Sequence, residues 1–280
     1  MTRLDVALVA RGFARSRGHA RDLIDYCAVH LNGTIATKAS TSVAPEDSIE
    51  VVVGDAAQAL EPTWVSRAAG KLLGALEDLP GGGPDIAGVR AADVGACTGG
   101  FTQVLLERGA DHVLAIDVGH GQLAEQLRTD PRVSDRSGVN ARDLTAEAIG
   151  GPVDLVVADL SFISLTLVLE PLTEIVRIAG DLVLLIKPQF EVGRRGLDGR
   201  GVVRPGPWRR QAVESVVRHA YERGLDLRSL VVSRTPGQDG NTEFVAWFRR
   251  PGSSAVGRSW EAVSEMIDAA LAAAQDGGGR

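Results

Sequence analysis

The chain has 280 residues, of which 44% are hydrophobic and 24% are charged. This composition excludes a disordered chain and leaves enough residues for one large and one small domain. The formal net charge of −6 excludes nucleic-acid binding by the chain as a whole, so that any such binding must use local basic patches.

Residues 1–60 predict a small α+β domain. Apolar residues at helical spacing in RLDVALVARGF and SRGHARDLIDYCAV indicate two helices, with Ser16 as a candidate N-cap of the second. Asn32-Gly33 in VHLNGTIA is a hairpin signal, and DSIEVVV is typical of a strand. Residues 61–84 then hold the end of a linker and a leading helix, VSRAAGKLLGALEDL, which the Gly- and Pro-rich stretch 80–85 ends.

Strands and helices alternate over residues 85–250, which predicts an α/β domain with a doubly wound, Rossmann-like parallel sheet. The predicted strands are 89–94, 112–117, 153–158, 182–186, 227–232 and 242–248, and the predicted helices are 101–108, 123–127, 165–178 and 209–223. Residues 251–280 predict an amphipathic helix from Trp260 and a short tail, with no recognisable chemistry.

The stretch DVGACTGGF follows the first strand of this sheet, where ligands bind in such folds. Gly95, Gly99 and Gly100 let the backbone approach a ligand, but their spacing is not G-x-G-x-x-G. Asp93 would repel a pyrophosphate and attract a cationic amino-acid group, and Asp117 ends the next strand, where an acid accepts hydrogen bonds from ribose hydroxyls. S-adenosylmethionine has both features, and a purely structural turn is the alternative.

Other sequence features exclude several classes of protein. Cys27 and Cys97 lie far apart, and the five histidines are scattered, so we expect neither a disulfide framework nor a bound metal. The first residues lack the apolar segment of a signal peptide, and no stretch approaches the ~18 apolar residues of a membrane helix. We therefore expect a cytoplasmic protein without membrane insertion.

Several motifs together resemble the TlyA family, which belongs with the FtsJ-like ribose 2′-O-methyltransferases: WVSRAAGKL, DVGACTGGFT, AIDVGHGQL, VNAR, VADLSFISL, LIKPQFEVG and GNTEFVAWF. The stretches RLDVAL, SRGHARDLI and NGTIATKAS resemble the S4-type RNA-binding domain, with Tyr26-Cys27-Ala28 where a glycine is usual. The resemblance, which extends to about Arg250, implies methyl transfer from S-adenosylmethionine to the ribose 2′-hydroxyl of cytidine in ribosomal RNA, within ribosomal subunits.

The resemblance also implies a Lys-Asp-Lys-Glu catalytic tetrad, whose members are Lys71, Asp159, Lys187 and Glu243. We expect Lys187 to accept the hydroxyl proton or to orient the hydroxyl, and Lys71 and Glu243 to hold the ribose and tune its pKa. Asp159 would pair with the lysines and lie near the methyl group. Only three lysines occur in the chain, and two fall on tetrad positions. Taken singly, Asp159 also fits a helix N-cap, Glu243 a surface strand charge and Lys71 a solvated helix face.

By the same motifs, the candidate cofactor-binding residues are Asp93, Gly95, Thr98, Gly99, Gly100, Phe101, Asp117, Val118, Asn140 and Arg142. The candidate RNA-binding residues are Arg3, Arg15, Arg17, Arg21, Lys38, Phe162, Arg194 and Arg195. Residues 194–210 hold six arginines and one aspartate, which suits a phosphate backbone, although a solvated loop has the same composition. Phe162 fits either stacking on an extruded base or core packing.

The sequence favours sugar methylation over base methylation, because the segment VADLSF lacks the prolines of base amine methyltransferases and neither cysteine is placed to attack a base.

Three functions other than methyl transfer remain as alternatives. An NAD-dependent oxidoreductase would use a similar sheet but a different glycine spacing. Relatives described as haemolysins suggest a membrane-active protein, and a passive RNA-binding module of the ribosome would explain only residues 1–60.

Overall fold

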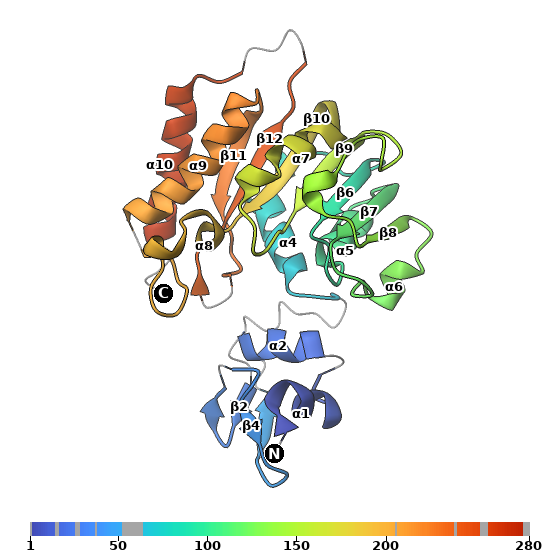
Figure 1. Cartoon of the computed structure of the whole chain (residues 1–280), viewed down its shortest axis with the longest axis vertical. Coiled ribbons are helices and arrows are strands. Elements are labelled where there is room, and N and C mark those ends of the chain that lie inside the picture. The colour runs from blue at the N-terminus through green and yellow to red at the C-terminus, as the bar shows by residue number, and fades with distance from the viewer. Residues whose placement is uncertain are drawn as a thin grey trace. The chain divides into compact units, whose positions relative to one another are not determined.

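The computed structural model describes residues 2–14, 17–25, 29–36, 38–51, 64–204, 206–237, 240–252 and 257–276. The chain forms two compact units, Met1–Gly70 and Lys71–Arg280, whose elements are labelled in Figure 1. Arg15, Ser16, Tyr26-Cys27-Ala28 and the whole linker predicted at 54–63 lie outside the described residues. The domain boundaries predicted at 60, 84 and 250 stay predictions.

The first unit contains two helices and short strands around its own core. Helices α1 (Leu4–Ala10) and α2 (Arg17–Asp25) pack against each other. Strand β2 (Val29–Leu31) pairs with β3 (Thr34–Ile35) and β5 (Ile49–Val51), and β1 (Thr2–Arg3) pairs with β4 (Ser42–Val43). Asn32 and Gly33 have φ of 52° and 77°, as a two-residue hairpin turn requires, so the predicted hairpin is confirmed.

A seven-stranded sheet forms the centre of the second unit, in the order β11-β12-β10-β9-β6-β7-β8. Its strands are β6 (Arg90–Val94), β7 (His112–Asp117), β8 (Val133–Ser137), β9 (Val153–Ala158), β10 (Val176–Ile186), β11 (Asp226–Val232) and β12 (Phe244–Arg249). The strands from β10 to β8 are parallel, which confirms the predicted doubly wound α/β class. Strand β12 is antiparallel to both of its neighbours, β10 and β11.

Helices cover both faces of this sheet (Figure 1). They are α4 (Ala68–Asp78), α5 (Gly100–Glu107), α6 (Glu125–Arg128), α7 (Leu169–Ile175), α8 (Pro188–Glu191), α9 (Pro207–Glu222) and α10 (Trp260–Asp276), with 3-10 turns η1 (Pro80–Gly82), η2 (Ala141–Asp143), η3 (Leu165–Leu167) and η4 (Arg194–Gly196). Helices α7, α9 and α10 share one hydrophobic core with the sheet, and α5 packs against β6 and β7. The C-terminal helix α10 is therefore part of the core.

Two sequence predictions differ from the structure. The helix predicted at 165–178 is only partly correct, because η3 and α7 cover 165–167 and 169–175, but the chain continues as β10 from Val176. The guanidinium of Arg250 binds the carbonyl oxygens of Thr173 and Val176, which the helix leaves without partners where it stops. Strand β8 was not predicted at all, because its sequence VSDRS carries the polar residues of an edge strand instead of an apolar run.

Candidate active site

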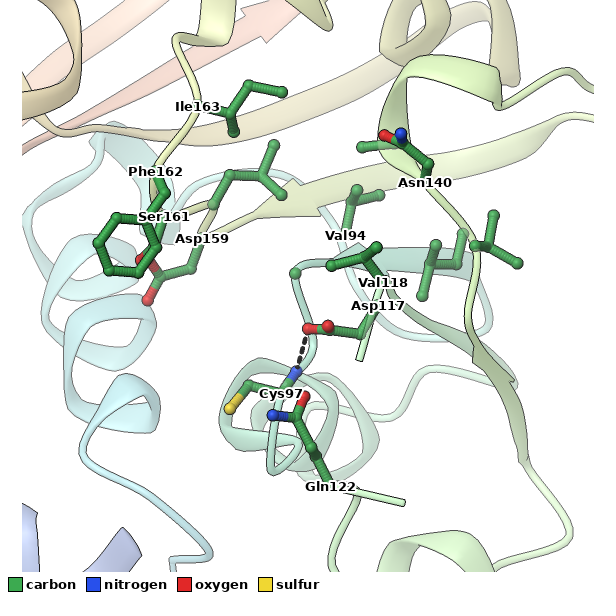
Figure 2. Close-up of a pocket in the computed structure, with 15 residues that line it drawn as sticks. Val94, Cys97, Asp117, Val118, Gln122, Asn140, Asp159, Ser161, Phe162 and Ile163 are labelled. Atoms are coloured by element: carbon green, nitrogen blue, oxygen red, sulfur yellow. Dashed lines mark hydrogen bonds between the residues drawn. The ribbon is translucent and has the colours of Figure 1, made fainter. Parts of the chain in front are cut away.

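The strand order of the sheet reverses between β6 and β9. In doubly wound sheets the turns after two such strands diverge and leave a crevice at their carboxyl ends. A cavity of about 450 Å³ opens there, lined by residues that follow β6, β7, β8 and β9. Figure 2 shows the segment from Asp159 to Ile163 on one side of the cavity and Asp117, Val118 and Asn140 on the other. The size suits a small organic molecule.

Four of the predicted cofactor residues line this cavity: Gly95, Asp117, Val118 and Asn140. The two carboxylate oxygens of Asp117 accept hydrogen bonds from the backbone N–H of Cys97 at 2.9 Å and of Gly119 at 2.7 Å. These bonds fix the carboxylate, and each oxygen keeps a further lone pair for a ligand hydroxyl. The side chain of Val118 is 67% exposed and offers an apolar surface to a flat ring.

Gly95 lets the ends of β6 and β9 approach each other. Its φ is 88°, and a Cβ atom at this position would lie 2.7 Å from the carbonyl oxygen of Asp159. Both the backbone conformation and the contact therefore exclude any larger residue. Gly99 has a different role, because a Cβ atom there would collide with Leu127, which packs behind the loop.

The other predicted cofactor residues are not part of the cavity wall: Asp93, Thr98, Gly99, Gly100, Phe101 and Arg142. Phe101 is buried, and the Arg142 side chain is exposed to solvent, while its backbone N–H donates to the side chain of Asn140. A role of these residues in cofactor binding stays a prediction.

Asp93 lies beneath the glycine loop and is 1% exposed. Its Oδ2 accepts hydrogen bonds from the backbone N–H and the hydroxyl of Thr102, at 2.8 and 2.7 Å, while its Oδ1 is buried without a partner. Burial raises the pKa of Asp93 to about 7 against the opposing bonds from Thr102, and the nearby Asp159 and Asp117 raise it further. A positively charged ligand group near Oδ1 would offset this cost, so the residue suits a ligand with an ammonium group.

The four predicted tetrad residues meet beside the cavity. The Nζ of Lys71, on α4, lies 2.8 Å from Glu243 Oε2 and 3.5 Å from Asp159 Oδ2. The Nζ of Lys187, which follows β10, lies 2.6 Å from Asp159 Oδ1 and donates to Ser161 Oγ at 2.8 Å. Asp159 therefore bridges the two lysines, and it also lines the cavity.

Burial and charge set the state of this network. The side chains of Lys71, Lys187 and Glu243 are 5%, 8% and 1% exposed. Burial opposes ionisation of Asp159, but the two lysines outweigh it and hold the pKa of this carboxyl below its usual range. Each charged member has an opposite charge beside it, as buried ionic groups require.

These positions decide between the alternatives left by the sequence. Lys71 and Glu243 are buried, so neither is a solvated surface charge. Asp159 caps no helix, because Ser164 is the residue that caps η3. Phe162 is 87% exposed, which excludes core packing.

Sequence reasoning missed several residues of this region. Cys97, Gln122, Leu160, Ser161 and Ile163 line the cavity, although none of them was among the predicted site residues. Gln189 was missed as well, and its Nε2 donates to Glu243 Oε1 at 3.0 Å. Only its position two residues after Lys187 could have indicated it.

Three of the candidate RNA-binding arginines of the first unit surround one acid. Asp5 is fully buried, and its carboxylate lies 3.0 Å from Arg3 Nε, 2.9 Å from Arg17 Nη2 and 3.6 Å from Arg21 Nε. The hydrogen bond from Arg3 is the largest cause that lowers the pKa of Asp5 to about 2, against the effect of burial, and Arg17 lowers it further. The arginines are about half exposed, so they remain open to a ligand.

The remaining RNA-binding candidates are also at the surface. Lys38 is exposed, and the segment it begins is hydrogen-bonded through Ala39 and Thr41 to the start of α1. Arg194 and Arg195 are exposed in η4. Within the described ranges, no cluster of three His, Cys, Asp or Glu residues suits a metal ion, and no helix is long and apolar enough to cross a membrane.

Comparison with known proteins gives two family matches. The sequence profile of the FtsJ-like methyltransferases matches residues 64–250, and that of the S4 domain matches residues 2–49.

Individual relatives match over nearly the whole chain. The chain is 49% identical to the 16S/23S rRNA (cytidine-2′-O)-methyltransferase TlyA of Mycobacterium tuberculosis, over 88% of this chain and 89% of the relative. It is 34% identical to Hemolysin A of Brachyspira hyodysenteriae, over 88% of this chain and 99% of the relative. A solved structure of a candidate hemolysin from Streptococcus thermophilus is 29% identical, with a TM-score of 0.74 over 100% of this chain and 98% of that one.

The raised pKa of Asp93 leads to a test of stability against pH. Because its pKa rises from 3.8 to about 7 on folding, the protonated carboxyl stabilises the fold below pH 4, and this contribution is lost as the pH rises to about 7. We expect Asp93→Asn, measured by urea unfolding, to gain stability relative to the unchanged chain by up to about 1.4 kcal/mol per pH unit in this window. A constant difference between pH 4 and pH 7 would contradict the assignment.

Proposed function

This chain belongs to the TlyA family of FtsJ-like methyltransferases, and on that premise we propose that it transfers a methyl group from S-adenosylmethionine to the ribose 2′-hydroxyl of cytidine in ribosomal RNA. The observation that carries the proposal is the convergence of Lys71, Asp159, Lys187 and Glu243 beside a cavity at the switch point of the sheet. The oxidoreductase alternative is not favoured, because the matched family consists of methyltransferases.

The residues of the cavity suit S-adenosylmethionine. Asp117 would accept hydrogen bonds from its ribose, and Val118 and Ile163 would contact its adenine. Asp93 does not line the cavity, but its buried Oδ1 has no partner, so we propose that this carboxylate acts on the ammonium group of the cofactor from beneath the glycine loop. When bound, this cofactor supplies a methyl group on a sulfonium, and the electron pair of the broken S–C bond stays on sulfur while the 2′-oxygen forms the new bond. Asp159, at the cavity wall, places the network of lysines next to this group.

The acceptor hydroxyl must lose its proton as it attacks. Asp159 is a weak base, because its two lysine neighbours hold its pKa below the usual range. Lys187 is therefore the residue that we assign as proton acceptor, with Ser161 and Asp159 fixing its Nζ. Lys71 is bound by two carboxylates and barely exposed, so it balances the charges of Glu243 and Asp159 rather than reaching out to the ribose.

RNA is the substrate that the exposed groups favour. Phe162 stands open beside Asp159 and can stack on an extruded base, and Arg194 and Arg195 follow Lys187 closely in the chain and can contact phosphates. The arginines around Asp5 provide a second phosphate-binding surface on the S4 unit. We propose the ribosomal subunit as the natural context and the cytoplasm as the compartment.

The proposal is tested by mapping 2′-O-methyl groups in ribosomal RNA from cells with and without this protein. We expect one or a few cytidines to lose the modification when the protein is absent, and the purified protein to restore it on undermethylated subunits with S-adenosylmethionine. Transfer of the methyl group to a base instead of the ribose, or no methylation of RNA at all, would refute the proposed function.

The role of Lys187 is tested by a change that keeps its charge. Lys187→Arg leaves a cation beside Asp159, but a guanidinium cannot be deprotonated in a protein and so cannot accept the hydroxyl proton. We expect kcat to fall by at least roughly 100-fold, with unchanged calorimetric affinity for S-adenosylhomocysteine. Substantial turnover by this variant would show that the lysine only orients the hydroxyl.

The arginine cluster of the S4 unit can be tested by whether a substitution at Asp5 raises or lowers the affinity for RNA. Asp5→Asn makes the unit more positive, so it would strengthen RNA binding if the arginines acted only as charges. We expect weaker binding in filter assays instead, because Arg3 and Arg17 lose the carboxylate that holds them. Asp47→Asn, which adds the same charge where Asn32 and Ala44 are the partners, serves as the control. A gain in affinity for Asp5→Asn, equal to that of the control, would exclude preorganisation by Asp5.

A further inference from the structure

Glu191, at the end of α8, joins two segments of the active site. Its Oε2 accepts a hydrogen bond from Ser164 Oγ at 2.5 Å, and its Oε1 accepts one from the backbone N–H of Leu165 at 2.8 Å. Both partners belong to the segment that follows β9. One carboxylate thus uses both of its oxygens to attach that segment to α8.

The attached segment carries Phe162 in an unusual backbone conformation. Its φ is 64°, which lies in the left-handed region that bulky residues rarely adopt, and its side chain is 87% exposed. Such a strained conformation persists only where neighbouring contacts hold it. Burial of the ring does not hold it, and the one ring contact of Phe162 in the described part of the chain is with Phe190, at 5.3 Å between centroids.

The contacts that hold this conformation lie on both sides of Phe162. On one side, Ser161 Oγ accepts the hydrogen bond from Lys187 Nζ at 2.8 Å. On the other side, Ser164 and Leu165 are bound by Glu191. Lys187 directly precedes α8 and Glu191 ends it, so the helix spans the segment and holds it at both ends.

We propose that Glu191 is a positioning residue of the methyl transfer, which holds Phe162 at a fixed place relative to Lys187. The inference rests on the proposed function, in which Phe162 stacks on the base and Lys187 acts on the 2′-hydroxyl of the same nucleotide. Base and hydroxyl belong to one rigid unit, so a displaced ring turns the hydroxyl away from Lys187. Glu191 itself touches neither the cofactor nor the RNA in this arrangement.

A matched set of variants tests this role. Glu191→Ala removes both hydrogen bonds, and we expect kcat to fall roughly 10- to 100-fold, the size of effect that small displacements of reacting groups produce. The KM for ribosomal RNA and the affinity for S-adenosylhomocysteine should not change. Glu191→Gln can accept from Leu165 and donate to Ser164, so it should restore most of the turnover. Glu170→Ala, an exposed glutamate on α7, is the control.

A double variant distinguishes positioning from a general loss of structure. If Glu191 acts through Phe162, then Glu191→Ala should cause no further loss of kcat in a Phe162→Ala background. Additive losses, or a loss in Glu191→Gln as large as in Glu191→Ala, would overturn the inference. If Glu191→Ala does not fold, Ser164→Ala, which removes only the hydroxyl contact, should give a smaller fall in kcat, and wild-type turnover by it would overturn the inference.

The failure of this inference is separate from failure of the proposed function. Absence of 2′-O-methylation by the unchanged protein would refute the proposed function whatever the variants do. Methylation by the unchanged protein together with undiminished kcat in Glu191→Ala would refute only the positioning role.

Discussion

The need to pair buried charges fixes the architecture of the active site. Two lysines and two carboxylates lie together with at most 12% of any side chain exposed. Removal of one partner from such a pair typically costs about 3–5 kcal/mol. The helix α4 and the ends of β9, β10 and β12 must therefore meet at one place, and the sheet order, with β12 beside β10, is what allows Glu243 to reach Lys71.

Asp159 connects this network to the cavity. Its carboxylate lies between Lys71 and Lys187, while its carbonyl oxygen faces Gly95 so closely that no Cβ atom would fit. The glycine loop and the lysines thus depend on the same residue, one through its backbone and the other through its side chain. In the proposed reaction, a group held in the cavity and a hydroxyl held by Lys187 would meet at Asp159, so this one residue would serve both halves of the transfer.

How much the sequence could predict depends on whether a feature is local. Strands β7 and β9 matched their predicted bounds because each contains a run of consecutive apolar residues, 113–116 and 155–158, whereas polar β8 left no such signal. The tetrad was identified by motif resemblance, and the spacing of its members along the chain gives no hint that they meet. The bonds of Ser161 and Gln189 depend on which strands lie side by side, and the buried Oδ1 of Asp93 depends on the packing of α5. No local pattern encodes these contacts.

The distribution of charge indicates that affinity for RNA and selection of the nucleotide come from different parts of the chain. In a chain of net charge −6, the exposed arginines around Asp5 and in η4 form local basic surfaces. Contacts of this kind with phosphates do not depend on the base sequence. The S4 unit can therefore hold RNA without selecting a nucleotide, and selection must come from the shape of the RNA and from the geometry at the cavity. In the proposed mechanism, Phe162 stacks on the base and Lys187 acts on the hydroxyl of the same nucleotide, so a nucleotide that cannot leave its stack would be bound nearby but not modified.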